Sequence, residues 1–110
     1  MAFGRRAQWE ALRTRAASSF TGSYQTLGTP LGHPAILLKI SNNTSVDITI
    51  SLDGTTDQIF IPDGTFTLYD INTNHQDENV FAAAKNTQFY VKGAMGTGDV
   101  YLEVIYSYRA

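Results

Sequence analysis

The residues that could perform chemistry in this 110-residue chain are few, and their spacing does not suit catalysis. The glycine-rich segment Gly93–Gly98 offers successive N–H groups of the kind that cradle an anion. A phosphate-binding loop continues with Lys and Ser or Thr and then a helix, whereas Asp99 follows here and would place a carboxylate beside a phosphate. We therefore interpret Gly93–Gly98 as a connection between two strands.

Metal ligands and nucleophiles are equally sparse. The two histidines, His33 and His75, have no partner at metal-binding spacing. The acids of Asp53–Asp57 and the pair Asp77 and Glu78 do not match the ligand spacing of a calcium loop. The absence of cysteine excludes disulfides, thiolate zinc sites and thiol nucleophiles, and the chain has no Gly-x-Ser-x-Gly turn. The sequence therefore predicts a non-enzymatic protein without a metal or a cofactor.

The composition indicates one folded domain. Hydrophobic residues make up 43% of the chain and charged residues only 16%, with a net charge of -2. The uncharged runs are far shorter than the roughly 18 apolar residues that a membrane-spanning helix needs, which predicts no membrane association. The residues after Arg5 and Arg6 are polar, including Gln8 and Glu10, so we expect no secretory signal at this end.

The charge is distributed unevenly along the chain. Residues 1–17 hold four arginines and one glutamate, whereas the remainder holds four cations and nine acids. Trp9, Leu12 and Ala16 recur at helical spacing, which predicts a short amphipathic helix too short to be stable alone. Residues 18–34 are rich in Ser, Thr, Gly and Pro, with apolar residues between them that indicate an extended segment laid along a surface. Together, residues 1–34 are predicted to form a basic N-terminal arm, helical and then extended.

From Ala35 onward the apolar residues alternate with a period of two, which is typical of β-strands. Alternation on both sides of Asn42–Ser45 predicts a hairpin between about Ile36–Ile40 and Val46–Leu52. Four further strands are predicted over Gln58–Ile61, Thr65–Ile71, Gln88–Lys92 and Val100–Tyr108. Asn72–Asn79 is predicted to be a loop, and Val80–Ala84 to be either a strand or a helical turn. Residues 35–110 are therefore predicted to form an all-β domain, an antiparallel β-sandwich or small barrel of jelly-roll type.

Several motifs of this β region resemble those of small structural proteins of tailed bacteriophage virions. They are Lys39–Gly54 (KISNNTSVDITISLDG), Ile61–Gly64 (IPDG), Leu68–Ile71 (LYDI), Gln88–Gly93 (QFYVKG) and Gly96–Leu102 (GTGDVYL). The resemblance extends over residues 35–106. It implies a non-enzymatic part of the head, neck or tail, found in the virion after assembly in the cytoplasm of the bacterial host. It also implies that the partners are other copies of the chain and the portal, tail or capsid proteins.

Our leading hypothesis is a ring at the head-to-tail connection, in which the N-terminal arm contacts the next subunit, the portal or a tail component. The residues expected to carry this assembly are Phe3, Arg5, Arg6, Trp9, Leu12, Arg13 and Phe20. Two alternatives are a capsid decoration or cement protein and a carbohydrate-binding module that uses exposed tyrosines. Nucleic acid is disfavoured as a partner, because the nine acids of the body would repel a polyanion.

Overall fold

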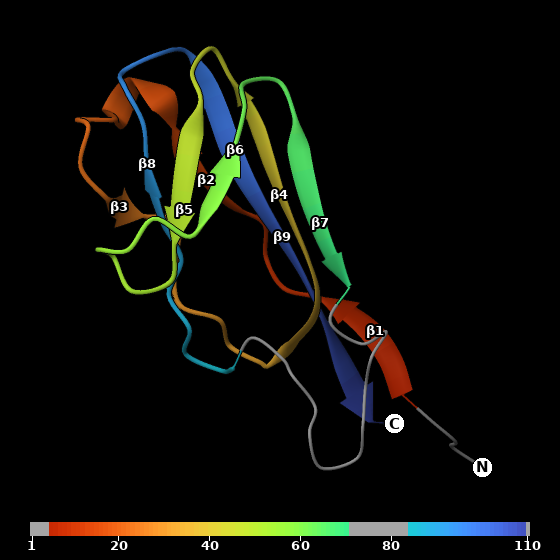
Figure 1. Ribbon diagram of the computed structural model, residues 1–110. Helices are drawn as coiled ribbons and strands as arrows, with labels where there is room; N and C mark the ends of the chain where they lie inside the picture. Colours follow the sequence, from red (N-terminus) through yellow and green to blue (C-terminus); the bar gives the residue numbers. More distant parts are fainter. Residues whose placement is uncertain (1–4, 71–83, 110) are drawn as a thin grey trace.

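The computed structural model describes residues 5–70 and 84–109, which form two antiparallel β-sheets (Figure 1). In this part of the chain there is a short 3-10 turn at Ala17–Ser19 and no α-helix. The strands are β1 (Arg5–Trp9), β2 (Arg13–Ala16), β3 (Gln25–Thr26), β4 (Ala35–Thr44), β5 (Ile48–Ser51), β6 (Ile59–Ile61), β7 (Phe66–Asp70), β8 (Tyr90–Lys92) and β9 (Gly98–Arg109). The prediction of an all-β, antiparallel fold is therefore confirmed.

The larger sheet has five strands in the order β1–β9–β4–β7, and β2 pairs with β9 beside β1. The smaller sheet has four strands in the order β3–β8–β5–β6. The long strand β9 is central to the larger sheet, because it pairs with β4 on one side and with β1 and β2 on the other. The two sheets face each other as in a β-sandwich (Figure 1).

Alternate residues of the facing strands build one hydrophobic core between the sheets. On β9, Val100, Leu102 and Val104 are fully buried, while the residues between them are partly exposed. The core is completed by Ala17, Phe20, Leu27, Leu31, Ala35, Leu38, Ile40, Ile48, Ile50, Ile61, Phe89 and Val91. Each large aliphatic or aromatic side chain in this set contributes roughly 1.5–3 kcal/mol relative to an exposed position.

The predicted N-terminal helix is wrong for the described residues, because Arg5–Trp9 and Arg13–Ala16 are strands. Trp9 lies opposite Ile105 and Arg13 lies opposite Leu102. Four residue steps from Trp9 to Arg13 therefore match three steps on β9, which is the signature of a β-bulge. The bulge shifts the phase of the alternation and leaves Trp9 and Leu12 both exposed, so their spacing of three imitates a helix. The edge of β9 offers main-chain hydrogen-bond partners to both segments. A helix this short would be only marginally stable in water, so the strand pairing is favoured.

The predicted extended segment contributes to the core. Phe20, Leu27 and Leu31 are buried between the sheets. The N–H of Leu27 donates to the Phe89 carbonyl at 2.8 Å, and the N–H of Leu31 donates to the Thr87 carbonyl at 2.9 Å. The side chains of these residues therefore pack inside the protein. The backbone N–H groups of Leu27 and Leu31 extend the main-chain pairing of this segment beyond β3.

The predicted hairpin is also wrong, because β4 belongs to the larger sheet and β5 to the smaller one. β4 continues through Asn42 and ends at Thr44, and the chain then crosses between the sheets. The buried Asn42 amide donates to the carbonyls of Val46 at 2.9 Å and Ile61 at 3.0 Å, which stabilises this crossing. The predicted loop over 72–79 and the segment 80–84, apart from Ala84, lie outside the described residues.

Candidate functional site

The solvent-facing side of the five-stranded sheet, here called the outer face, carries four large exposed apolar side chains. Trp9 is 64% exposed, Leu12 56%, Phe66 59% and Leu68 51%. They come from both edges of the same sheet, whereas the smaller sheet contributes Phe60. An apolar face of this kind marks an interaction site more often than a scattered single residue does.

Strand register arranges the outer face in rows that cross the sheet. The rows are Phe66–Ser41–Tyr101, Leu68–Lys39–Glu103, and Asp70–Leu37–Ile105–Trp9. The Lys39 ammonium lies 4.7 Å from the centre of the Phe66 ring, a cation–π contact between neighbouring rows. The face therefore carries large apolar side chains at both edges, Lys39 and Glu103 near its middle, and Asp70 at one end of its β7 edge.

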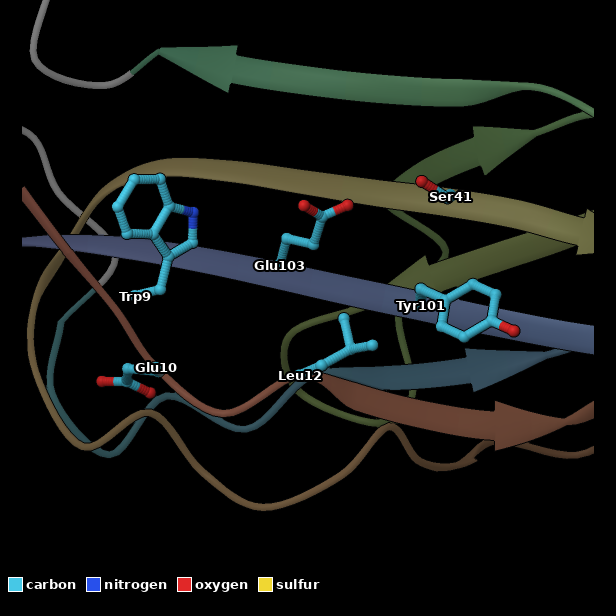
Figure 2. A pocket seen from close by; sticks show the side chains of 6 residues that line it. All are labelled: Trp9, Glu10, Leu12, Ser41, Tyr101 and Glu103. Atoms are coloured by element: carbon cyan, nitrogen blue, oxygen red, sulfur yellow. The ribbon is translucent and has the colours of Figure 1, made fainter.

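A hollow of about 490 Å³ opens on the outer face between Trp9 and Tyr101. Figure 2 shows these two rings at its opposite ends, with Glu103 between them, and Glu10, Leu12 and Ser41 complete its lining. A second hollow of about 310 Å³ shares Ser41 and Tyr101 and continues toward Phe66. The two hollows therefore adjoin each other over β4 and β9.

The β-bulge between β1 and β2 shapes one side of the larger hollow. Glu10, Ala11 and Leu12 stand opposite only Glu103 and Val104 of β9. The N–H of Glu10 still donates to the Val104 carbonyl at 3.0 Å, so the edge stays attached through the irregularity. The bulge places both Glu10 and Leu12 in the lining of the hollow.

Glu10 is held by its own protein contacts. Its Oε1 accepts from Arg13 Nη2 at 2.7 Å and from the Gly32 N–H at 3.3 Å, and its Oε2 lies 2.7 Å from His33 Nδ1. Burial alone would raise the pKa of Glu10, but the hydrogen bonds from His33, Arg13 and Gly32 and the charge of Arg13 outweigh it and lower this pKa. The His33 ring stacks on Tyr106 with centroids 3.6 Å apart. Glu10 is therefore a structural carboxylate at the rim of the hollow.

Glu103 and Ser41 differ from Glu10 in this respect. Within the described part of the chain, neither the Glu103 carboxylate nor the Ser41 hydroxyl has a hydrogen-bond or ion-pair partner. Tyr101 Oη has only a long contact, 3.5 Å, to Asp99 Oδ2. The hollow therefore presents polar groups whose hydrogen-bonding capacity is not used by the described part of the protein.

A second polar cluster lies near the smaller sheet. Tyr24 Oη donates to Asp57 Oδ1 at 2.5 Å, and Lys92 Nζ lies 2.9 Å from the same oxygen. Burial and the neighbouring Asp57 raise the pKa of Tyr24 to about 12. The Lys92 ammonium also lies 4.7 Å from the centre of the Tyr24 ring. These contacts link Tyr24, Asp57 and Lys92 to one another on the surface.

The structure separates the residues that the sequence grouped as an assembly arm. Trp9 and Leu12 lie together on the outer face, and Arg13 lies behind them, buried against the segment 29–30. Arg5 and Arg6 belong to β1, Phe20 is a core residue, and Phe3 lies outside the described residues. Sequence reasoning missed Ser41 and Glu103, because only the register of β4 and β9 brings them beside Trp9.

The described residues meet neither the requirements of a metal site nor those of a membrane-spanning helix. Among residues 5–70 and 84–109, no three His, Asp or Glu side chains are grouped so as to hold a metal ion. The same residues include no helix long and apolar enough to cross a membrane. His75, Asp77 and Glu78 lie outside the described residues.

The fold and the outer face define an all-β protein with a hollowed, partly apolar sheet surface. Comparison with protein-family models, with curated proteins and with solved structures finds no match to this chain. Its function is therefore argued from its own residues.

Proposed function

We propose that the protein is a non-enzymatic structural protein of a tailed-phage virion that assembles as a ring at the head-to-tail connection. The motifs of residues 35–106 support the virion class. The two edges of the five-stranded sheet support the ring, and they are the observation that carries this proposal. In a ring, each copy would place one edge against the opposite edge of its neighbour.

The direction of the edge strands suits such a contact. β1 is antiparallel to β9, β9 is antiparallel to β4, and β4 is antiparallel to β7. β1 and β7 therefore run in opposite directions at the two sides of one sheet. When copies follow one another around a ring, the β7 edge of one meets the β1 edge of the next as an antiparallel pair, which is the more stable pairing. No described strand occupies the outer edge of either.

The N-terminal strand also benefits from a partner. Beyond Tyr106, the described part of the chain pairs β9 only with β1, since the register of β4 begins at Ala35 opposite Tyr106. Figure 1 shows this two-stranded ribbon extending away from the smaller sheet. A two-stranded ribbon is marginally stable in water, and an additional strand would stabilise it. The contact would also cover an edge that otherwise invites aggregation.

Cysteine cross-linking tests the edge contact, because the natural chain contains no cysteine. We expect Leu68→Cys in β7 and Ala7→Cys in β1 to cross-link when the two single variants are mixed with a short bismaleimide. The double variant should give a ladder that ends at the size of a closed ring. The single variants alone should stay uncrosslinked. Dimers of Leu68→Cys alone would show that like edges meet, and an absence of cross-links at ring-forming concentration would contradict the proposal.

Placement in the virion requires a second measurement. We expect quantitative mass spectrometry of purified virions to give a copy number that matches the portal. A number proportional to the capsid protein would favour the alternative of a decoration or cement protein on the head. Absence of the chain from the virion would contradict the structural class altogether.

A further inference from the structure

The larger hollow combines an exposed aromatic ring with polar groups that have no partner among the residues that the structure describes. Trp9 is the most exposed residue of its lining, and Glu103 and Ser41 supply a carboxylate and a hydroxyl. We propose that this hollow binds a neutral oligosaccharide. The site uses side chains of the outer face, whereas the proposed ring contact uses the main-chain edges of β1 and β7, so the two proposals are independent.

The aromatic rings provide the apolar half of the recognition. Figure 2 shows Trp9 and Tyr101 at opposite ends of the hollow, both beside β9. The flat side of a sugar ring presents C–H groups, which pack on the electron-rich face of an indole or phenol. Trp9 lies opposite Ile105, four residues along β9 from Tyr101, and this corresponds to about 13 Å of strand. The hollow therefore has room for more than one sugar unit.

The polar groups provide the other half and favour a sugar over a protein segment. Glu103 lies between the two rings, and Ser41 lies beside Tyr101 in the neighbouring strand (Figure 2). An apolar protein segment on this surface would bury the Glu103 carboxylate without a hydrogen bond, which is unfavourable. Sugar hydroxyls donate to a carboxylate while the ring carbons pack on Trp9, so one ligand satisfies both.

The charge of the hollow favours a neutral ligand. Glu103 has no ion-pair partner among residues 5–70 and 84–109, since the ammonium of Lys39 lies over the Phe66 ring. The charge of Glu10 at the rim is engaged by Arg13. A phosphate, sulfate or uronic acid would be repelled by Glu103, whereas a neutral sugar would not. The volume of about 490 Å³ lies within the range of small-ligand sites, roughly 300–1,000 Å³.

Trp9 is the only tryptophan of the chain and therefore reports directly on the hollow. The experiment is a glycan-array screen followed by titration of the native protein with array-positive glycans and with cellohexaose, maltohexaose and chitohexaose. We expect a saturable change in Trp9 fluorescence with at least one neutral oligosaccharide, and an affinity that raised salt leaves unchanged.

Variants followed by calorimetry locate the site. Trp9→Ala should weaken binding about tenfold, which is the order of magnitude expected when a ring loses its packing on an aromatic face. Glu103→Gln keeps the shape of the side chain and should weaken binding by several fold. Phe60→Ala removes an equally exposed aromatic residue from the smaller sheet and should leave binding unchanged. Circular dichroism confirms that each variant is folded.

Four outcomes would overturn the proposal. The first is the absence of a neutral-glycan response on the array and in all titrations. The second is binding by Trp9→Ala that equals binding by the native chain. The third is binding that Phe60→Ala weakens as much as Trp9→Ala does, which would show that the loss is not specific to the hollow. The fourth is preferential binding of a polyanion that weakens steeply with salt, as nucleic acid would.

Discussion

Arg13 and Glu10 form an ion pair across the β-bulge, with Arg13 Nη2 2.7 Å from Glu10 Oε1 and both side chains more than nine-tenths buried. The same guanidinium donates to the carbonyls of Thr29 at 2.7 Å and Pro30 at 3.0 Å. One cation thus joins the edge of the larger sheet to the segment that runs from β3 to β4. A buried, multiply bonded arginine of this kind is costly to remove, because the carboxylate of Glu10 loses its buried cation and the carbonyls of Thr29 and Pro30 lose a donor.

We therefore expect Arg13→Ala to lower the free energy of unfolding by about 3 kcal/mol. The matched control is Arg15→Ala in the same strand. Arg15 is only partly buried and donates to Ser19 Oγ and the Thr26 carbonyl, so its loss should cost about 1 kcal/mol. Urea unfolding followed by circular dichroism compares the two variants. Equal losses would contradict the structural role assigned to Arg13.

The same carboxylate makes stability depend on pH. Because the folded-state pKa of Glu10 lies below its ordinary value of 4.5, its contribution is fully present above that value and is lost as the pH falls through the folded pKa. We expect Glu10→Gln to be less stable than the native chain at neutral pH, with a difference that shrinks toward about pH 3. The lowered pKa values of Asp53 and Asp57 act in both proteins and cancel in this difference. A difference that is independent of pH would contradict the prediction.

Close packing at the start of β9 requires a glycine at position 98. Gly98 has a φ of +89°, and a Cβ there would overlap the carbonyl oxygen of Asn43 in the paired strand β4. Gly64 has a similar φ of +72°, but no heavy atom lies within 4 Å of its added Cβ. We expect Gly98→Ala to destabilise the protein by about 3 kcal/mol and Gly64→Ala by about 1 kcal/mol. Thermal unfolding separates backbone strain, which both share, from the clash, which only Gly98 has.

The sequence predicted the β class and the strands after residue 45, because alternation over β5, β7 and β9 is a local property of the chain. It did not predict which strands pair, because that depends on contacts between distant residues. Asn42 illustrates this difference, since a buried asparagine reads as a turn residue until Ile61 and Val46 are placed beside it. The outer face depends in the same way on a register that joins residues some sixty positions apart, such as Ser41 and Tyr101.

The segment before residue 35 shows a further effect of tertiary contacts. Its apolar residues were expected to lie along a surface, yet Phe20 is 1% exposed and packs against Gly93 in the core. A composition rich in Ser, Thr, Gly and Pro correctly predicts an extended, irregular backbone for this segment. It does not predict that the few apolar side chains of the segment are buried in the core. Those side chains make the segment part of the folded unit.

This packing predicts how truncation of the chain affects its folding. A variant that lacks residues 1–20 loses β1, β2 and the buried side chains of Ala17 and Phe20, and it exposes the edge of β9. We expect this variant to be unfolded or aggregated. Phe20→Ala alone should cost about 3–4 kcal/mol, as for a fully buried phenylalanine. Phe60→Ala is the matched control, because Phe60 is 63% exposed and its loss should change stability by less than about 0.5 kcal/mol. Chemical unfolding and amide-dispersion NMR provide the measurement, and a well-dispersed spectrum from the truncated variant would show that residues 21–110 fold without β1, β2 and Phe20.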